Sequence, residues 1–223
     1  GNNAIMENVK ERSRKYLRIL DEQKLKIIIG IAIIIAIVLP ITLYKQRTNN
    51  DFYEVWGRIW RIMSETETAK QGEPEKNSET INAFISEYTF LKDNLYATPA
   101  TPWLLLELGN TQYKAGKFED AILTYNEFIV EYSKHPLLSI VRQSLGYAYE
   151  EKGQFKDAVN QFEKILSNNE AVFLKAQASL DAGRCYEKLE QLDTALAAYK
   201  KAIDASPESY FANMARYRLE DIE

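Results

Sequence analysis

The sequence contains very few of the residues that build metal centres, disulfides and nucleophilic catalysts. Among its 223 residues there is one cysteine, Cys185, and one histidine, His135. A single cysteine excludes an internal disulfide, and the two residues together exclude the commoner zinc sites, which take three or four His and Cys ligands. No glycine-rich phosphate loop and no G-x-S-x-G elbow is present. We therefore expect no enzyme: no catalytic residue, no cofactor, no metal and no small-molecule substrate.

The chain as a whole has no excess of positive charge. The chain carries 28 Lys and Arg against 32 Asp and Glu, for a net charge of −4. Residues 1–26 hold seven basic and four acidic residues, a net charge of +3, which leaves −7 for the rest of the chain. Because nucleic-acid binding needs a basic surface that neutralises phosphates, we expect no nucleic-acid partner for the part after residue 26.

Charge is absent altogether from one apolar run. Residues 27–44 contain nine isoleucines and no charged residue, and a transmembrane helix needs about 20 mostly apolar residues, so the run predicts one membrane span. A cleaved signal peptide is the competing interpretation, but its apolar core is usually about 7 to 15 residues long and ends in a small-residue cleavage site. Here the run closes on Leu39, Pro40 and Ile41 without an A-x-A pattern, which favours an uncleaved signal anchor.

The flanks of this run predict its orientation. Seven basic residues precede it, and the four nearest basic residues after it are Lys45, Arg47, Arg58 and Arg61. The positive-inside bias therefore predicts a cytoplasmic N-terminus and export of the remainder. We expect a single-pass membrane protein with its larger part outside the cytoplasm. Whether residues 1–5, which precede Met6, are native stays open.

A 37-residue period runs through the second half of the chain. Equivalent positions carry Leu or Ala, then Gly, then Ala: Leu108, Gly109 and Ala121; Leu145, Gly146 and Ala158; Ala182, Gly183 and Ala195. Apolar residues recur every three or four positions on either side of a second glycine, which predicts two short helices per copy joined at a left-handed cap. We expect the small residues to let the two helices of each pair approach closely.

The cap position differs in the third copy. Gly116 and Gly153 occupy it in the first two copies, and Glu190 replaces them in the third. Because a non-glycine residue at positive φ costs roughly 1 kcal/mol, we expect a modified turn there. Cys185 stands where the other copies have Thr111 and Ala148, which favours a small packing residue over a reactive thiol.

These residues resemble the tetratricopeptide repeat (TPR) family. Residues matching its consensus include Leu105, Leu108, Gly109, Gly116, Phe118, Ala121 and Tyr125 in the first copy, and Gly183, Tyr186, Ala195, Tyr199, Ala202 and Pro207 in the third. The resemblance implies an α-solenoid of TPR helix pairs. Together with the apolar run, it predicts an all-α fold: a single N-terminal transmembrane helix followed by about three TPR repeats, with a degenerate leading pair and a C-terminal capping helix. The period exceeds the family's usual 34 residues, which implies a few extra residues in each copy.

The region between the apolar run and the repeats has helical spacing but no repeat glycine. One aromatic stripe consists of Phe52, Tyr53, Trp56, Ile59, Trp60 and Met63, and a second apolar stripe of Ile81, Phe84, Ile85, Tyr88 and Leu91. Two interpretations of the aromatic stripe stay open: a membrane-interface belt, or the contact between two helices of the leading pair, which we favour. The expected domains are 1–26, a basic cytoplasmic tail; 27–44, the span; 45–100, the leading pair; and 101–223, the TPR domain.

Function is expected on a surface. In the TPR family the first helix of each repeat lines a concave groove, and the resemblance implies a protein-binding groove here formed by Trp103, Leu106, Asn110, Tyr113, Ile140, Gln143, Tyr147, Leu180 and Arg184. Exposed aromatic side chains suit binding of a peptide or a partner helix. We expect Trp103, Tyr113 and Tyr147 to form an aromatic end of the groove. The alternative is that the leading helices, or the chain's own tail, cover these residues.

One known TPR ligand is disfavoured. TPR domains that grip the carboxylate of cytosolic heat-shock chaperones use a set of Lys, Asn and Arg residues, and the matching positions here are Leu106, Asn110, Ser144, Gln177 and Asp181. Only Asn110 agrees, which weakens a mitochondrial outer-membrane receptor as an interpretation.

The overall plan resembles the YfgM-like family of bacterial inner-membrane TPR proteins. This resemblance implies a periplasmic module associated with the Sec translocon or with periplasmic chaperones. The alternative is a structural scaffold of another multiprotein envelope complex. The sequence leaves open the identity of the partner and the oligomeric state.

Overall fold

The computed structural model describes the backbone at residues 2–69, 74–95 and 97–222, and within these ranges leaves out the side chains of residues 2–5, 17, 19–22, 25, 66–69 and 74–77. The described chain is helical and contains no strand, which confirms the predicted all-α class. The elements are α1 (Asn2–Ala69), α2 (Pro74–Asn94), α3 (Thr101–Lys114), α4 (Phe118–Glu131), α5 (Leu138–Glu151), α6 (Phe155–Leu166), the short 3₁₀ helix η1 (Val172–Leu174), α7 (Lys175–Lys188), α8 (Leu192–Ala205) and α9 (Tyr210–Ile222).

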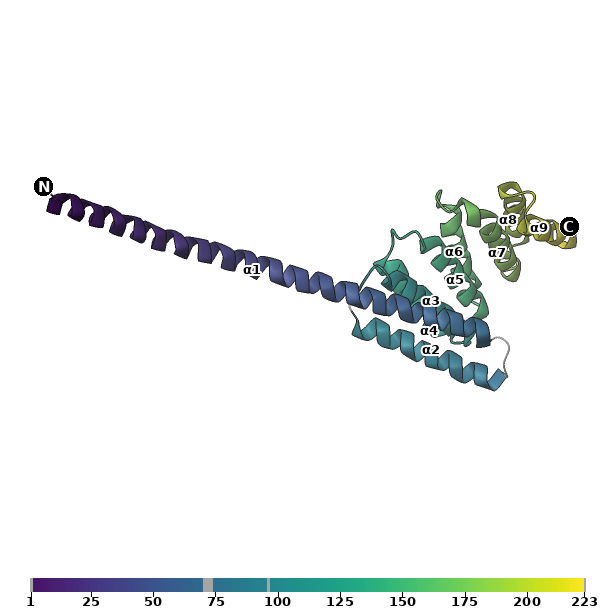
Figure 1. The fold of residues 1–223 in the computed structure, drawn as a ribbon. Coiled ribbons are helices and arrows are strands. Elements are labelled where there is room, and N and C mark those ends of the chain that lie inside the picture. Colours follow the sequence, from purple (N-terminus) through teal and green to yellow (C-terminus); the bar gives the residue numbers. More distant parts are fainter. Residues whose placement is uncertain (1, 70–73, 96, 223) are drawn as a thin grey trace. The chain divides into compact units, whose positions relative to one another are not determined.

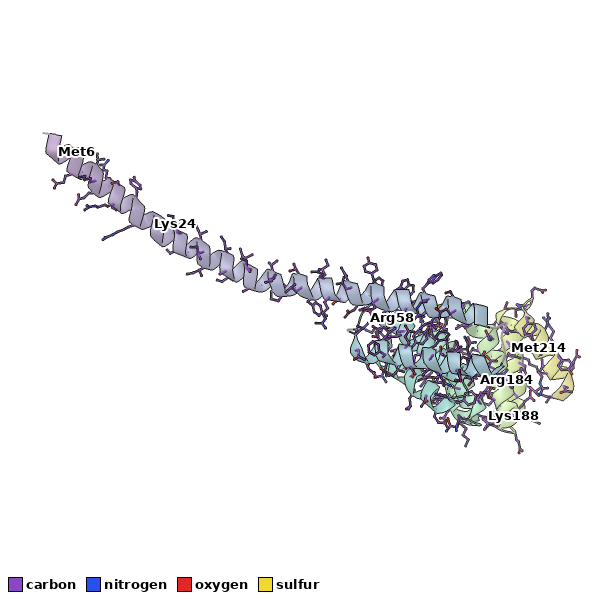
Figure 2. The ribbon with its side chains drawn as sticks, turned by 60° about the horizontal axis from the view of Figure 1, so that its bottom comes forward. Met6, Lys24, Arg58, Arg184, Lys188 and Met214 are labelled. Carbon is purple, nitrogen blue, oxygen red and sulfur yellow. The ribbon has the colours of Figure 1, made fainter. Side chains whose placement is uncertain are left out.

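The chain divides into two compact units, Gly1–Asn50 and Asp51–Glu223. The first unit consists of the N-terminal part of α1, whose described side chains, from Met6 through Lys24 and beyond, stand out from the helix on all sides (Figure 2). Within the described residues one segment, Lys26–Glu65, is long and apolar enough to cross a membrane by length and composition, criteria that a signal sequence also meets.

In the second unit, helices that follow one another in sequence pack side by side (Figure 1). The three pairs α3/α4, α5/α6 and α7/α8 correspond to the three copies of the 37-residue period, and α9 packs on α7 and α8 as the first helix of a further pair. Ala212 and Ala215 of α9 are fully buried there. Each helix pair thus buries its apolar side against its neighbours, as in an α-solenoid.

The repeat glycines lie directly beneath an aromatic ring of the second helix. A Cβ atom added at Gly146 would lie 2.4 Å from Cε1 of Phe162, and Gly109 and Gly183 meet Tyr125 and Tyr199 in the same way. These separations are far below ordinary carbon contacts. The expected close approach is therefore present, and the ring of the second helix is what fills the space.

The three caps are alike, which corrects the expectation of a modified third turn. Gly116 and Gly153 have φ of 72° and 69°, and Glu190 keeps φ at 60°. The backbone hydrogen bonds also repeat: the N–H of Gln154 donates to the carbonyl of Tyr149, and the N–H of Gln191 donates to that of Tyr186. The geometry of the helix pair therefore holds Glu190 in the left-handed region despite its side chain.

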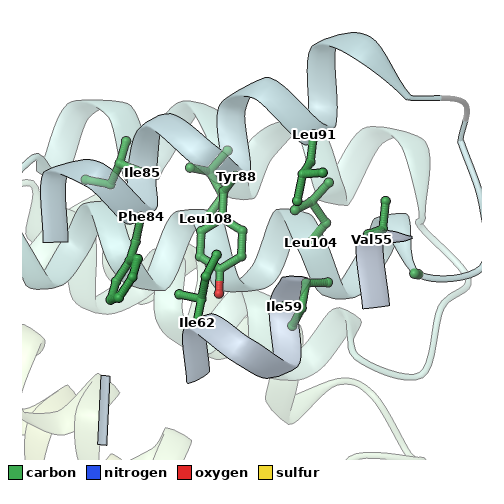
Figure 3. Close-up of a cluster of buried hydrophobic side chains, with 10 residues drawn as sticks. Val55, Ile59, Ile62, Phe84, Ile85, Tyr88, Leu91, Leu104 and Leu108 are labelled. Carbon is green, nitrogen blue, oxygen red and sulfur yellow. The ribbon is translucent and has the colours of Figure 1, made fainter. Parts of the chain in front are cut away.

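The core of the leading pair is aliphatic on the α1 side. Val55, Ile59 and Ile62 pack against Phe84, Ile85, Tyr88 and Leu91 of α2 and against Leu104 and Leu108 of α3 (Figure 3). Phe52 packs partly buried against this cluster. The favoured interpretation of the aromatic stripe as a helix contact is right for Phe52 and Ile59. It is wrong for Tyr53, Trp56, Trp60 and Met63, whose side chains are exposed.

Candidate protein-binding groove

The nine groove residues predicted from the sequence lie on three first helices. Trp103, Leu106, Asn110 and Tyr113 are on α3; Ile140, Gln143 and Tyr147 are on α5; and Leu180 and Arg184 are on α7. The structure brings some of them together around a cavity and places others in the core or in ion pairs.

A cavity of about 190 Å³ opens between α3 and α5. Its lining consists of Asn110, Tyr113, Lys114, Tyr125, Ser144 and Tyr147. Tyr113 and Tyr147 therefore meet at one site, as predicted for the aromatic end. Sequence reasoning missed Tyr125 and Ser144 as members of this site. The signal for Tyr125 was the repeat glycine: its ring crosses Gly109, and its hydroxyl reaches the side-chain carbonyl of Asn110 at 2.8 Å.

Trp103 does not line this cavity. Its ring packs edge-on against Trp56 of α1, with ring centroids 5.9 Å apart. Leu106 is buried in the core cluster between α3, α4 and α5, and Ile140 packs partly buried against the same cluster. Leu180 packs partly buried against the cluster around Tyr199. Leu106 is thus a packing residue, and a leading helix covers part of Trp103, as the alternative interpretation proposed.

A hydrogen-bonded network links α5 and α7 beside the cavity. The hydroxyl of Tyr147 donates to Oδ2 of Asp181 at 2.7 Å and accepts from Nε2 of Gln177 at 2.8 Å. Arg184, labelled on α7 in Figure 2, forms a bidentate pair with Glu150 at 2.9 and 2.8 Å and a third contact with Asp181 at 2.9 Å. The network fixes the orientation of the Tyr147 ring, which is one wall of the cavity.

One cation and two carboxylates meet in this network: Arg184 pairs with both Glu150 and Asp181. Burial raises the pKa of Asp181 above its ordinary value of 3.8, and the charge of Arg184 and the hydroxyl of Tyr147 oppose that shift. Burial also raises the pKa of Tyr147, together with the neighbouring charge of Asp181. Because Glu150 and Asp181 already neutralise Arg184, its guanidinium is not free to bind an anionic ligand.

Gln143 carries a buried hydrogen-bond donor that has no partner. It is on α5 one turn before Tyr147, so the two side chains share a face of the helix. The residue is only 9% exposed, and its side-chain nitrogen is the one buried side-chain N or O atom among the described residues without a hydrogen-bond partner. An unsatisfied buried donor costs about 1 to 3 kcal/mol, so a ligand carbonyl that reached this nitrogen would recover part of that cost.

The single histidine and the single cysteine of the sequence both pack against other residues of the repeats. His135 packs its ring edge-on against Phe128, and its Nδ1 accepts the backbone N–H of Leu137 at 3.2 Å. Cys185 is fully buried in α7, and burial raises the pKa of its thiol. In the part of the chain that the structure describes, no group of three or more His, Cys, Asp or Glu side chains is arranged to hold a metal ion.

Comparison with known proteins supports the assignment of the repeats to the tetratricopeptide type. Residues 104–135 and residues 144–210 each match a tetratricopeptide repeat family model. A search of curated protein sequences finds no match to this chain. The TPR resemblance read from the sequence is therefore confirmed for the repeat region.

Several solved structures have a similar fold. PcrH from Pseudomonas aeruginosa is 20% identical with a TM-score of 0.50, over 57% of this chain and 95% of that chain. A tetratricopeptide repeat protein from Parabacteroides merdae is 19% identical with a TM-score of 0.53, over 74% and 60% of the two chains. MamA is 22% identical with a TM-score of 0.50, over 66% and 85%. At these identities the likeness concerns the fold alone, a TPR-type solenoid.

Proposed function

We propose that this protein is a membrane-anchored TPR module that binds an extended protein segment over the cavity between α3 and α5. The observation that carries the proposal is a cavity walled by the rings of Tyr113, Tyr125 and Tyr147. The buried side-chain nitrogen of Gln143, which has no hydrogen-bond partner and lies one helical turn before Tyr147, adds to it. A polypeptide offers both things that such a site needs: backbone carbonyls for the amide of Gln143, and side chains for the space between the tyrosine rings.

The kind of ligand follows from the site and has a parallel in a similar fold. Tyrosine rings supply large contact area at small entropic cost, and Lys114 and Asn110 add polar groups at the rim. PcrH, whose fold is similar, has been crystallised with the chaperone binding region of PopD, at a TM-score of 0.50 to this chain. That complex supports a protein segment as the ligand class here.

The apolar run 27–44 is proposed as an uncleaved anchor in a bacterial inner membrane. The basic excess of residues 1–26 supports a cytoplasmic tail. With the tail in the cytoplasm, the leading pair at 45–100 and the TPR domain at 101–223 lie in the periplasm. The boundaries at residues 26, 44 and 100 are part of this proposal.

Two classes of partner are compatible with this placement. The first is the Sec translocon or a periplasmic chaperone, as the resemblance to the YfgM-like family implies. The second is a set of envelope-complex subunits that the protein scaffolds. Crosslinking in native membranes followed by affinity purification separates them: translocon subunits would be recovered in the first case, and stoichiometric subunits of another complex in the second.

The groove is tested with Gln143→Leu and Tyr113→Ala. Gln143→Leu removes the partnerless buried donor at similar volume, so it should weaken partner recovery without lowering the melting temperature. Tyr113→Ala removes one wall of the cavity and should weaken recovery by an amount typical of a buried aromatic anchor, about 2 kcal/mol. Lys164→Glu, at an exposed position of α6, is the matched control and should bind as the wild type does. Wild-type recovery by both groove variants would contradict the proposal.

A further inference from the structure

All three tryptophans of the chain gather on one exposed surface of the second unit. This tryptophan stripe consists of Tyr53, Trp56, Trp60 and Met63 on α1 and Trp103 on α3. Tyr53 is 71% exposed and Trp60 68%, while Trp56 and Trp103, which contact each other, are each 40% exposed. Single exposed apolar residues are ordinary, but a contiguous aromatic surface of this kind marks an interaction site.

The spacing of the stripe is that of a helix-packing seam. Tyr53, Trp56, Trp60 and Met63 follow one another at intervals of three, four and three residues, the pattern with which one helix packs along another. The neighbouring seam of α1, which includes Ile59, already packs against α2 and α3. Within the second unit, α1 thus has two apolar faces: one packs in the core and the other faces outward.

The charges beside the stripe argue against a lipid surface as its cover. Arg58 pairs with Glu54 at 2.7 Å, and Arg61 pairs with Glu65 at 3.1 Å and with Glu87 at 2.5 Å. Helices that lie on membranes carry an excess of Lys and Arg on the polar face to attract anionic lipids. Two arginines against three glutamates give no such excess, so the border of the stripe offers no attraction to anionic lipids.

The exposed area is sufficient for a pair. At about 200 Å² for each aromatic side chain, the five exposed fractions amount to about 500 Å² per copy and about 1,000 Å² for two copies, the lower limit for a specific interface. We propose that the tryptophan stripe is a homodimer interface, in which a second copy of this chain packs its own stripe against the first around a two-fold axis. The proposal rests on the proposed membrane anchor, because two copies anchored in one membrane stand in the same orientation.

The oligomeric state of the full chain in detergent tests this interface by analytical ultracentrifugation. Tyr53→Glu combined with Trp60→Glu should leave monomers, with the dimer dissociation constant raised by about 30-fold or more for each lost anchor. Leu123→Glu combined with Val130→Glu is the matched control, because these α4 side chains are equally exposed but lie outside the stripe, and it should remain dimeric. A wild type that stays monomeric at all concentrations, or a stripe variant that stays dimeric, would overturn the proposal.

Intrinsic fluorescence supplies a readout that needs no variant. Because every tryptophan is in the stripe, the emission of the wild type should shift to the blue as the dimer forms with rising concentration. In proteoliposomes of phosphatidylcholine, brominated acyl chains should leave the emission of the dimer unquenched. Strong quenching without dimer formation would mean that lipid covers the stripe and would refute the homodimer. Failure of the groove is separable, because Tyr113→Ala should impair partner recovery while the chain remains dimeric.

Discussion

Replacement of Gly146 by leucine tests the packing of the repeats. A Cβ atom at this position would lie 2.4 Å from Cε1 and 2.6 Å from Cζ of Phe162, about 1 Å or more inside an ordinary carbon contact of about 3.5 to 4 Å. The ring of Phe162 is fully buried and packs against Tyr147 at a centroid distance of 5.8 Å. Because Tyr147 is itself held by Asp181, the ring cannot move aside without disturbing the α5/α7 network.

The expected loss is about 1 to 3 kcal/mol, the usual cost of overpacking a core. Helix propensity works in the opposite direction, since replacing glycine in a helix gains about 1 kcal/mol. Gly57→Ala is therefore the matched control: a Cβ at Gly57 meets nothing within 4 Å, so this variant should gain stability. Urea and thermal unfolding of the full chain in detergent, followed by circular dichroism, measure both. A Gly146→Leu protein as stable as the wild type would mean that the helix pair is packed differently.

Three further outcomes follow from other parts of the structure. Glu190→Gly should stabilise the chain by up to about 1 kcal/mol because it relieves a positive φ, while Gly153→Ala should destabilise it by about 1 kcal/mol; unfolding midpoints decide both. Burial alone would raise the pKa of Glu187, but hydrogen bonds from Arg218 and Tyr199 hold it below its ordinary value of 4.5. Glu187 therefore contributes stability above pH 4.5 that is lost as the pH falls through its folded pKa. Glu187→Gln should therefore have a lower free energy of unfolding than the wild type at pH 7, and unfolding curves measured in acid should show no difference between the two. A cysteine at Asn169 should react with a membrane-impermeant reagent from outside the inner membrane, and protection in spheroplasts would overturn the periplasmic placement.

The repeat region was predictable because the same local geometry recurs three times. A glycine beneath an aromatic ring and a glycine at a left-handed cap each leave a mark at a fixed interval in the sequence. The third cap was mispredicted because the local cost of positive φ at Glu190 was weighed without the packing of α7 on α8, which fixes the turn. Tertiary contacts outweigh a local preference of roughly 1 kcal/mol.

The leading pair and the groove were harder to predict. On α1 two seams of helical spacing run side by side, and spacing alone does not say whether Ile59 or Trp60 faces the core. The stripe predicted from the sequence contains both residues, yet only Ile59 packs inside, beside Val55 and Ile62. On α7, the neutralisation of Arg184 depends on Glu150 from the preceding repeat, and such a contact between repeats leaves no mark in the spacing of either helix.

Site-specific photocrosslinking in native membranes tests the central claim most directly. An aromatic photoreactive residue in place of Tyr113 keeps a ring in the wall of the α3/α5 cavity, and the same residue in place of Leu123 stands on an exposed part of α4. The proposed function predicts a discrete protein adduct from position 113 that is absent from position 123 and is lost when Gln143→Leu is added. Equal adducts from both positions, or none from position 113, would contradict the binding of a protein segment at this cavity.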